Sequence, residues 1–316
     1  MDLQDLLDFP LHLLDATAKV DSAALRLEPS TGLVIAGMGG SAVGGALARA
    51  VLGEREQRPI VCVRDYVLPS WVDGSWTVLL SSYSGGTEET LACWEAVPDG
   101  AQRVVVTTGG ELGERARAAG VPVIPLPGGF QPRAAAGYAT VSALGVAAAC
   151  GAAPSLREEI AAAAAALLED DLQSQARALA RAIGSDIPLI VGGGLTAPVA
   201  YRWKTQVNEN ANRPAFAAEL PEHDHNEIEG WGAPIVGIFL RDGAGHDRVA
   251  TRFDITAQMA RAAGSRIHEV TIEGDSRMER LARGVQLGDL TSFFLAQADG
   301  TDPGAIPALD ALKAAL

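Results

Sequence analysis

Three hydroxyl side chains surround a pair of glycines in SYSGGTEET, residues 82–90. Ser82, Ser84 and Thr87 follow an apolar run and directly precede a helical pattern. Hydroxyl groups, together with the free N–H groups at a helix N-terminus, form a binding site for a compact dianion such as phosphate. An ordinary helix cap needs one such hydroxyl, with acidic residues in the first turn. Three hydroxyls around two glycines therefore favour phosphate binding over a simple cap.

A second glycine-rich loop lies in LVIAGMGGSAVGG, residues 33–45, where Ser41 opens a helical pattern. As G-x-G-x-x-A, this loop matches the dinucleotide-binding fingerprint, and Asp65 follows about 20 residues later, where an acid would hold a ribose hydroxyl. A nicotinamide oxidoreductase is therefore one interpretation. A pyrophosphate site needs glycines for close backbone approach, whereas a ring of hydroxyls suits a compact phosphate. We accordingly expect a substrate phosphate on both loops, at Gly40, Ser41, Ser82, Ser84 and Thr87.

Two charged residues stand at helix ends where their charge opposes the helix dipole. Glu209 lies in the last turn of a predicted helix over 196–211, and Arg133 opens a predicted helix over 134–150. Such positions cost a few tenths of a kcal/mol, which favours a functional role for Arg133, whereas position alone leaves a functional and a solvated Glu209 equally open. The alternatives are a solvated Glu209 paired with Arg213, and an Arg133 that bridges surface carboxylates.

Two histidines occur in HDHNEIEGW, residues 223–231. We expect His225 to lie exposed just before a helix start, with Asn226 and Glu229 as a capping box, where it can transfer protons near neutral pH. The spacing of His223 and His225 also suits two metal ligands on one strand, but no third soft ligand is near. The sequence therefore predicts no metal site, and His223 is expected at the surface.

The bulk composition limits the classes of partner. The chain has 316 residues, 48% of them hydrophobic and 20% charged, with a formal net charge of −14. This composition is typical of a globular protein, and the acidic balance argues against nucleic acid. The three cysteines have no C-x-x-C spacing and are expected to pack as small hydrophobes. Neither a signal peptide nor an apolar run long enough to span a membrane is evident, so we expect a cytoplasmic protein without membrane contact.

Short apolar runs alternate with helical patterns along most of the chain, which predicts an α/β fold with doubly wound, mainly parallel sheets flanked by helices. Expected strands are 33–36, 59–63, 77–81, 103–107, 121–125, 189–192, 234–240 and 267–272. Expected helices are 41–52, 87–96, 111–119, 134–150, 196–211, 247–262, 277–298 and 305–315. The alanine-rich stretch 155–183 is expected to form one long connecting helix.

The second half of the chain resembles the first. Residues 189–199 repeat the pattern of residues 33–43, with Gly194 at the place of Gly39 and Thr196 at the place of Ser41. Two copies of one α/β unit account for this similarity. We therefore expect a first domain over residues 1–153, with an N-terminal helix, and a second domain over 154–316 that includes the connecting helix.

The loop sequences GMGGSA and SYSGGTEET together resemble the sugar isomerase (SIS) domain. NENANRPAF and ELPEHDHNEIEGW, residues 208–216 and 219–231, resemble the bifunctional phosphoglucose/phosphomannose isomerase family. The resemblance implies two tandem SIS domains and active sites shared across a homodimer. It also implies a metal-independent aldose–ketose isomerase that interconverts glucose 6-phosphate or mannose 6-phosphate with fructose 6-phosphate through a cis-enediolate, without a cofactor.

The same resemblance implies the roles of three residues. Glu209 matches the base that carries a proton between C2 and C1, and Arg133 matches an arginine that stabilises the enediolate. His225 matches the histidine that opens the sugar ring and acts on the active site of the neighbouring subunit.

The sequence departs from the family near its C-terminus, where a hydroxyl residue and then a lysine are usual. Thr291 or Ser292 can supply the hydroxyl, but Gln297, Ala298 and Asp299 stand where the lysine is expected. Two alternatives follow: a phosphosugar isomerase of narrower specificity, such as one for mannose 6-phosphate only, or a non-catalytic sugar-phosphate-binding protein.

Overall fold

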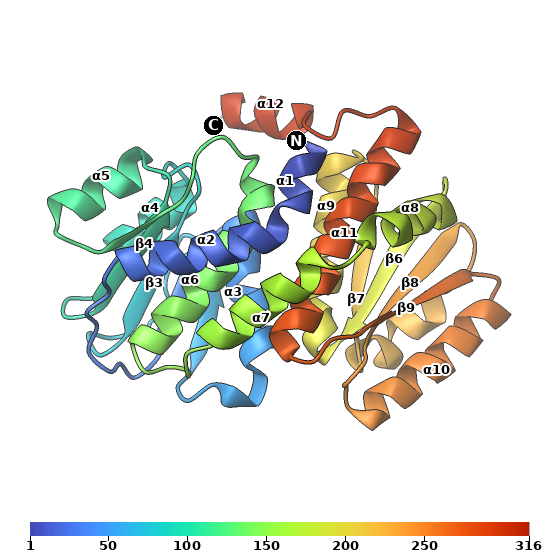
Figure 1. Ribbon diagram of the computed structural model, residues 1–316, viewed down its shortest axis with the longest axis horizontal. Helices are drawn as coiled ribbons and strands as arrows, with labels where there is room; N and C mark the ends of the chain where they lie inside the picture. Colours follow the sequence, from blue (N-terminus) through green and yellow to red (C-terminus); the bar gives the residue numbers. More distant parts are fainter. Residues whose placement is uncertain (316) are drawn as a thin grey trace. The chain divides into compact units, whose positions relative to one another are not determined.

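The computed structural model describes residues 1–315, which form two compact units (Figure 1). We call residues 8–165 the N-terminal unit, and residues 1–7 with 166–315 the C-terminal unit. This division differs from the expected boundary after residue 153. Ile160 is buried and lines the same hollow as Val141 and Leu144, so this part of the chain packs with the N-terminal unit. Conversely, the Gln286 side chain donates to the carbonyl of Leu6, which ties the first residues to the C-terminal unit.

The N-terminal unit contains a five-stranded parallel sheet in the order β2-β1-β3-β4-β5. Its strands are β1 (Leu33–Gly37), β2 (Ile60–Val63), β3 (Thr77–Ser81), β4 (Gln102–Thr107) and β5 (Val123–Pro125). Every residue of β1 and β3 is buried, as expected for continuous apolar runs covered on both faces. The parallel α/β fold predicted from these runs is confirmed.

Helices cover both faces of this sheet. They are α2 (Phe9–Ser22), α3 (Gly39–Leu52), α4 (Glu88–Glu95), α5 (Gly110–Ala118), α6 (Ala136–Ala149) and the start of α7 (Arg157–Leu168), with 3₁₀ turns η1 (Gly53–Arg55) and η2 (Pro132–Ala135). The chain winds from β1 through α3 to β2 at one edge, and from β3 through α4 and α5 toward the other. Because such crossovers are right-handed, α3 and α4 lie on opposite faces.

The C-terminal unit has a four-stranded parallel sheet in the order β7-β6-β8-β9. Its strands are β6 (Ile187–Gly193), β7 (Phe216–Leu220), β8 (Ile235–Asp242) and β9 (Arg266–Ile272). Its helices are α1 (Leu3–Leu7), α8 (Leu172–Ile183), α9 (Ala197–Asn210), α10 (Asp247–Ala262), α11 (Arg277–Asp299) and α12 (Pro307–Ala315), with 3₁₀ turns η3 (Gly194–Thr196), η4 (Glu222–His225) and η5 (Glu227–Gly230).

The two sheets share one strand order, with β6 at the place of β1 and β8 at the place of β3. Gly39 and Gly194 both take positive φ angles, 52° and 57°, at the turn that follows the first strand of each unit. In the matching loop after β6, the Thr196 hydroxyl is fully hydrogen-bonded: it donates to the carbonyl of Leu240 and accepts from the N–H of Gly193. The hydroxyl of this loop is thus hydrogen-bonded within the C-terminal unit itself.

Two local expectations were wrong. The single helix expected over 155–183 is divided into α7 and α8, because Asp171 caps a new helix by accepting from the N–H of Ser174 at 3.4 Å. Strand β7 was not expected from the sequence, and it is an edge strand that pairs only with β6.

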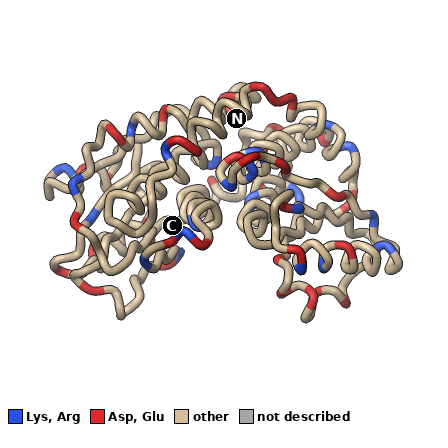
Figure 2. The backbone as a smooth tube through the Cα atoms, turned by 60° about the horizontal axis from the view of Figure 1, so that its bottom comes forward, with Lys and Arg blue, Asp and Glu red and all other residues tan. Residues whose placement is uncertain are grey.

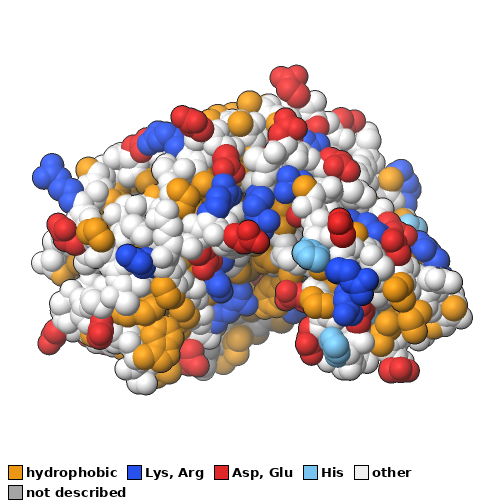
Figure 3. Space-filling view, turned by 90° about the horizontal axis from the view of Figure 1, so that it is seen from below, with side chains coloured by type: hydrophobic (Ala, Val, Ile, Leu, Met, Phe, Trp, Pro, Cys, Tyr) orange, Lys and Arg blue, Asp and Glu red, His pale blue; other side chains and the backbone are white. Residues whose placement is uncertain are grey.

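Along the described chain, Lys and Arg are interspersed with Asp and Glu rather than gathered in one stripe (Figure 2). On the face seen in Figure 3, hydrophobic side chains form separate patches among charged ones. The exposed large hydrophobic residues include Val67, Trp71, Phe216, Ile255 and Met259. Among the helices described, none is both long and apolar enough to cross a membrane.

Candidate functional site

The two glycine-rich loops lie side by side at the carboxyl edge of the first sheet. They follow β1 and β3, which are adjacent strands whose last residues, Gly37 and Ser81, are paired in register. From β1 the chain continues to β2 on one side, and from β3 it continues to β4 on the other, so the direction in which strands are added reverses between β1 and β3. Ligands of open α/β sheets bind at this reversal, outside the carboxyl ends of the strands. The fold therefore brings together the loops that we expect to bind phosphate.

The hydroxyls of the 82–87 loop have distinct roles. The Ser82 and Thr87 hydroxyl oxygens lie 2.8 Å apart, and Ser82 Oγ also accepts from the N–H of Gly85 at 3.0 Å. Ser84 is exposed, and its Oγ accepts from the N–H of Gly86 at 3.2 Å. Thr87 makes no side-chain cap bond to α4. The loop is thus braced by Ser82 and Thr87, and the first turn of α4 keeps N–H groups that an anion can use.

Two glycines make close backbone contacts that hold the 82–87 loop against the loop after β4. Gly85 has φ of +70°, and a Cβ built on it would overlap the Gly109 carbonyl oxygen. A Cβ built on Gly110, which has φ of +63°, would likewise overlap the carbonyl oxygen of Ser84. The N–H of Leu112 donates to the carbonyl of Gly85 at 2.8 Å. Only glycine fits at position 85.

We expect Gly85→Ala to destabilise the protein by more than about 2 kcal/mol, because the new methyl group meets backbone and the φ angle is unfavourable. Gly86→Ala is the matched control: its Cβ would meet nothing within 4 Å. We expect that variant to change the free energy of unfolding by less than about 0.5 kcal/mol. Urea denaturation of both variants measures the difference, and equal stabilities would contradict the close packing described here.

Arg133 lies next to the glycine-rich loop that follows β1 and contains Gly40 and Ser41. It is buried in η2, just before α6, rather than directly before an α-helix that begins at residue 134, as expected. A Cβ built on Gly40 would lie 3.1 Å from the carbonyl oxygen of Pro132 and 3.5 Å from the Cα of Arg133. The Ser41 hydroxyl, in the same loop, has no hydrogen-bond partner among residues 1–315. Gly40, Ser41 and Arg133 therefore border one side of the strand-reversal point.

A second cluster lies between α9 and α11 in the C-terminal unit. Glu209 occupies the last turn of α9 and is half-buried. The neighbouring Asn210 donates to the Ser292 hydroxyl at 2.8 Å, and Ser292 donates to the carbonyl of Asp289. Thr291 is also buried, and its hydroxyl donates to the carbonyl of Leu287. The residue next to Glu209 in α9 thus contacts one of the hydroxyl residues expected on α11.

A buried ion pair joins the same two helices. Arg202 and Asp289, each almost wholly buried, are linked by a 2.7 Å hydrogen bond. The Trp203 indole donates to the carbonyl of Gly284 at 2.8 Å, and Gly288 leaves no space for a side chain against the Trp203 ring. Sequence reasoning missed Arg202, Asp289 and Asn210. Polar and charged residues within otherwise buried helix faces were the available signal.

His225 lies exposed in η4, as expected, but its surroundings differ from the prediction. The Asn226 side chain accepts from the N–H of Glu227 at 2.6 Å and begins only a 3₁₀ turn, so the capping box with Glu229 is not formed. His223, expected at the surface, is fully buried beside Trp231, with ring centroids 5.6 Å apart. The buried His223 side chain therefore fixes the segment that carries His225.

Glu209 and His225 lie at opposite ends of the strands of the second sheet, Glu209 at the amino ends and His225 at the carboxyl ends. Since β6 and β7 are parallel, α9 returns the chain from the carboxyl edge to the amino edge, where Glu209 ends the helix. The chain then passes through β7 back to the carboxyl edge, where η4 carries His225. The 14 residues of α9 span about 20 Å. Within one C-terminal unit, these two side chains do not meet.

No group of three His, Cys, Asp or Glu side chains in residues 1–315 is arranged to hold a metal ion. All three cysteines are free thiols. Burial, followed by the charges of Asp65 and Glu89, raises the pKa of Cys93 to about 11, so that this thiol stays protonated at neutral pH.

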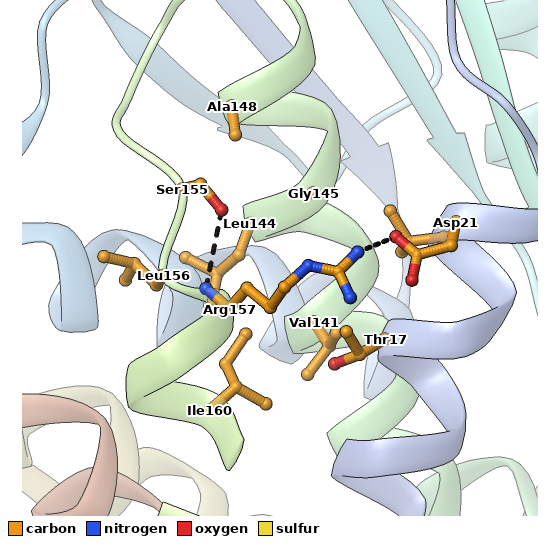
Figure 4. Close-up of a pocket in the computed structure, with 11 residues that line it drawn as sticks. Thr17, Asp21, Val141, Leu144, Gly145, Ala148, Ser155, Leu156, Arg157 and Ile160 are labelled. Atoms are coloured by element: carbon orange, nitrogen blue, oxygen red, sulfur yellow. Dashed lines mark hydrogen bonds and ion pairs between the residues drawn. The ribbon is translucent and has the colours of Figure 1, made fainter. Parts of the chain in front are cut away.

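A small hollow in the N-terminal unit lies away from the candidate residues. It is formed by α2, α6 and the start of α7, and Arg157 forms an ion pair with Asp21 at its rim (Figure 4). Its walls include Val141, Leu144 and Ile160, which give it a mostly apolar lining. None of the expected phosphate-binding residues lines it.

Comparisons with known proteins identify the family of the chain. Residues 172–316 match the model of the bacterial phospho-glucose isomerase C-terminal SIS domain. The bifunctional phosphoglucose/phosphomannose isomerase of Caldicellulosiruptor bescii is 36% identical over 309 residues, covering 92% of this chain and 91% of that protein. The protein of the same name from Aquifex aeolicus is 35% identical over 305 residues, covering 93% and 92%. The chain belongs to the bifunctional phosphoglucose/phosphomannose isomerase family.

A solved structure extends the similarity to the fold. The C-terminal domain of glucosamine-fructose-6-phosphate aminotransferase from Francisella tularensis superposes with a TM-score of 0.72 at 16% sequence identity, over 95% of this chain and 96% of that one. At this identity the likeness concerns the fold alone, a mainly parallel α/β architecture.

This family member has no lysine at the end of α11. Asp299, the last residue of the helix, lies 3.3 Å from Arg213, whose guanidinium also donates to the carbonyls of Gly184 and Asp186. Arg213 thereby ties the end of α11 to the turn before β6.

Proposed function

We propose that the chain is a metal-independent aldose–ketose isomerase that interconverts glucose 6-phosphate or mannose 6-phosphate with fructose 6-phosphate. The observation that carries this proposal is the pair of loops at the β1–β3 reversal, with exposed Ser84, a Ser41 hydroxyl that bonds to none of residues 1–315, and an α4 whose N-cap Thr87 makes no side-chain cap bond. These groups suit one phosphate dianion. Family membership supports a hexose phosphate as the molecule that carries it.

The residues then divide the reaction between them. His225 moves a proton between the ring oxygen and the C1 oxygen, which opens the sugar ring. Glu209 takes the proton from C2 and delivers it to C1, and the intermediate is a cis-enediolate. Arg133 places a positive charge beside the enediolate oxygens, where charge develops in the transition state. The two aldose phosphates differ only at C2, so one carboxylate that reaches either C2 proton accounts for both activities.

We further propose that the protein acts as a homodimer with shared active sites, each of two tandem SIS domains contributing to one site. The positions of Glu209 and His225 at opposite ends of the strands of one sheet support this arrangement, because a single C-terminal unit does not present both to one substrate. A second copy can supply His225 to the site that contains Glu209.

A narrower specificity is the second candidate, and the end of α11 motivates it. Gln297, Ala298 and Asp299 take the place of the lysine usual in the family, so a cation that would contact the substrate is missing there. A phosphosugar isomerase for mannose 6-phosphate alone is consistent with this difference.

A coupled assay for fructose 6-phosphate, started separately from each aldose phosphate with EDTA present, tests the proposal. We expect turnover of both substrates with kcat/KM values within about tenfold of each other, since the difference between the epimers is confined to C2. Preference for one aldose by more than about a hundredfold would support the narrower candidate. Loss of activity in EDTA would contradict metal independence.

A further inference from the structure

Tyr83 lies inside the loop that we expect to bind phosphate, but its side chain leaves that loop. Its backbone carbonyl accepts from the N–H of Thr108 at 3.1 Å and from the Thr108 hydroxyl at 2.8 Å. Its own hydroxyl donates to the carbonyl of Pro127 and accepts from the N–H of Phe130, both at 3.0 Å. One side chain therefore joins the 82–87 loop to the segment that precedes Arg133.

The segment between β5 and η2 needs such a support. Gly128 and Gly129 are adjacent, and a Cβ on either would meet nothing within 4 Å, so few packing contacts hold this part of the chain. The Phe130 ring is fixed on the other side, with ring centroids 4.9 Å from His12 and 6.2 Å from Tyr138. Pro132 and Arg133 follow after Gln131 and lie against Gly40.

We propose that Tyr83 is a positioning residue that couples phosphate binding on the 82–87 loop to the placement of Arg133. This inference rests on the proposed function. In a hexose 6-phosphate, the distance between the phosphate and the C1–C2 pair is limited by the carbon chain. The loop that binds phosphate and the arginine that faces the enediolate must therefore keep a constant separation. A misplacement of about 1 Å can lower a rate a hundredfold.

The kinetic test compares Tyr83→Phe with Tyr138→Phe. Each variant removes one hydroxyl and keeps the ring, and the Tyr138 hydroxyl donates to Asp15 between α6 and α2 at 2.9 Å. For Tyr83→Phe we expect kcat to fall about tenfold to a hundredfold. The inhibition constant of inorganic phosphate should change less than about twofold, because Ser82 and Thr87 still brace the loop. For Tyr138→Phe we expect both constants within about twofold of wild type.

Two kinetic outcomes would overturn the inference. Equal kcat values in the two variants would show that the Tyr83 hydroxyl contributes only to stability. A loss of phosphate affinity in Tyr83→Phe as large as the loss of kcat would show that the Tyr83 hydroxyl acts on the 82–87 loop alone.

Hydrogen–deuterium exchange separates a failure of this inference from a failure of the proposed function, because it needs no turnover. We expect inorganic phosphate to slow exchange in peptides 82–90 and 126–134 of the wild type, but only in peptide 82–90 of Tyr83→Phe. Phosphate protection of both peptides in the variant, or of peptide 82–90 alone in the wild type, would contradict the coupling.

Discussion

Replacing Glu209 by Gln is expected to lower kcat for isomerisation by about 10³–10⁴-fold, the contribution typical of the upper range of a positioned general base. The amide has nearly the shape of the carboxylate but cannot accept the proton from C2. Glu209 is half-buried at the end of α9, and its neighbour Asn210 is tied to Ser292, so the substitution leaves the surrounding packing in place. Steady-state assays with both aldose phosphates measure the loss.

Glu219→Gln serves as the control for this experiment. Glu219 is an exposed carboxylate in β7 of the same unit, and we assign it no role in the reaction. We expect kcat within about twofold of wild type. Both variants should retain the thermal stabilisation that inorganic phosphate gives, because the 82–87 loop is unchanged. Near-normal turnover in Glu209→Gln would mean that another group is the base.

A mixture of two inactive variants is expected to recover activity. If Glu209 of one copy and His225 of the other form one site, a heterodimer of Glu209→Gln and His225→Ala contains one intact site and one doubly defective site. Random pairing at equal concentrations makes half of the dimers mixed, so about a quarter of the wild-type activity should return. The activity of each variant is measured alone and after denaturation and refolding of both together.

The control is a mixture in which both substitutions are carried by the same chain, refolded with wild type. There the heterodimer has two sites that each hold one defect, so only the wild-type homodimers, again about a quarter of the dimers, remain active. If the mixture of single variants instead shows no more than the average of its parents, Glu209 and His225 act within one chain or the protein is not a dimer.

The local part of the candidate site could be predicted from the sequence. The two loops at residues 37–41 and 82–87 each follow a continuous apolar strand, and parallel strands bring their carboxyl ends to one edge. Adjacent order of β1 and β3 then follows from the doubly wound topology. Glu209 at the end of a helix was likewise predictable, because helical periodicity and the following Asn and Pro residues mark that end.

Features that depend on tertiary packing could not be predicted in this way. His223 is polar and lies in a polar stretch, yet its ring packs beside Trp231, which in turn packs beside Phe239. Strand β7 has the sequence FAAEL, which lacks β-branched residues, and only its pairing with β6 defines it. The Tyr83 hydroxyl reaches residues more than 40 positions away.

The break between α7 and α8 had a sequence signal that alanine content obscured. Glu169, Asp170 and Asp171 follow the alanine run, and acidic residues oppose the dipole at a helix C-terminus while Asp favours a new N-cap. Asp170 also pairs with Arg283 at 2.7 Å, a contact within the C-terminal unit. Helix propensity alone favours one continuous helix over 155–183, whereas the Asp171 cap and the Asp170–Arg283 pair favour the break between α7 and α8.

The most direct test of the account supplies fructose 6-phosphate as the sole substrate to the wild-type protein and to Glu209→Gln, with products followed by NMR. We expect the wild type to form both glucose 6-phosphate and mannose 6-phosphate, since one enediolate can be protonated at either face of C2. The Gln variant should form neither above the uncatalysed rate. Absence of both aldose phosphates with the wild type, or equal rates in the two proteins, would contradict the assignment of the reaction and of its base.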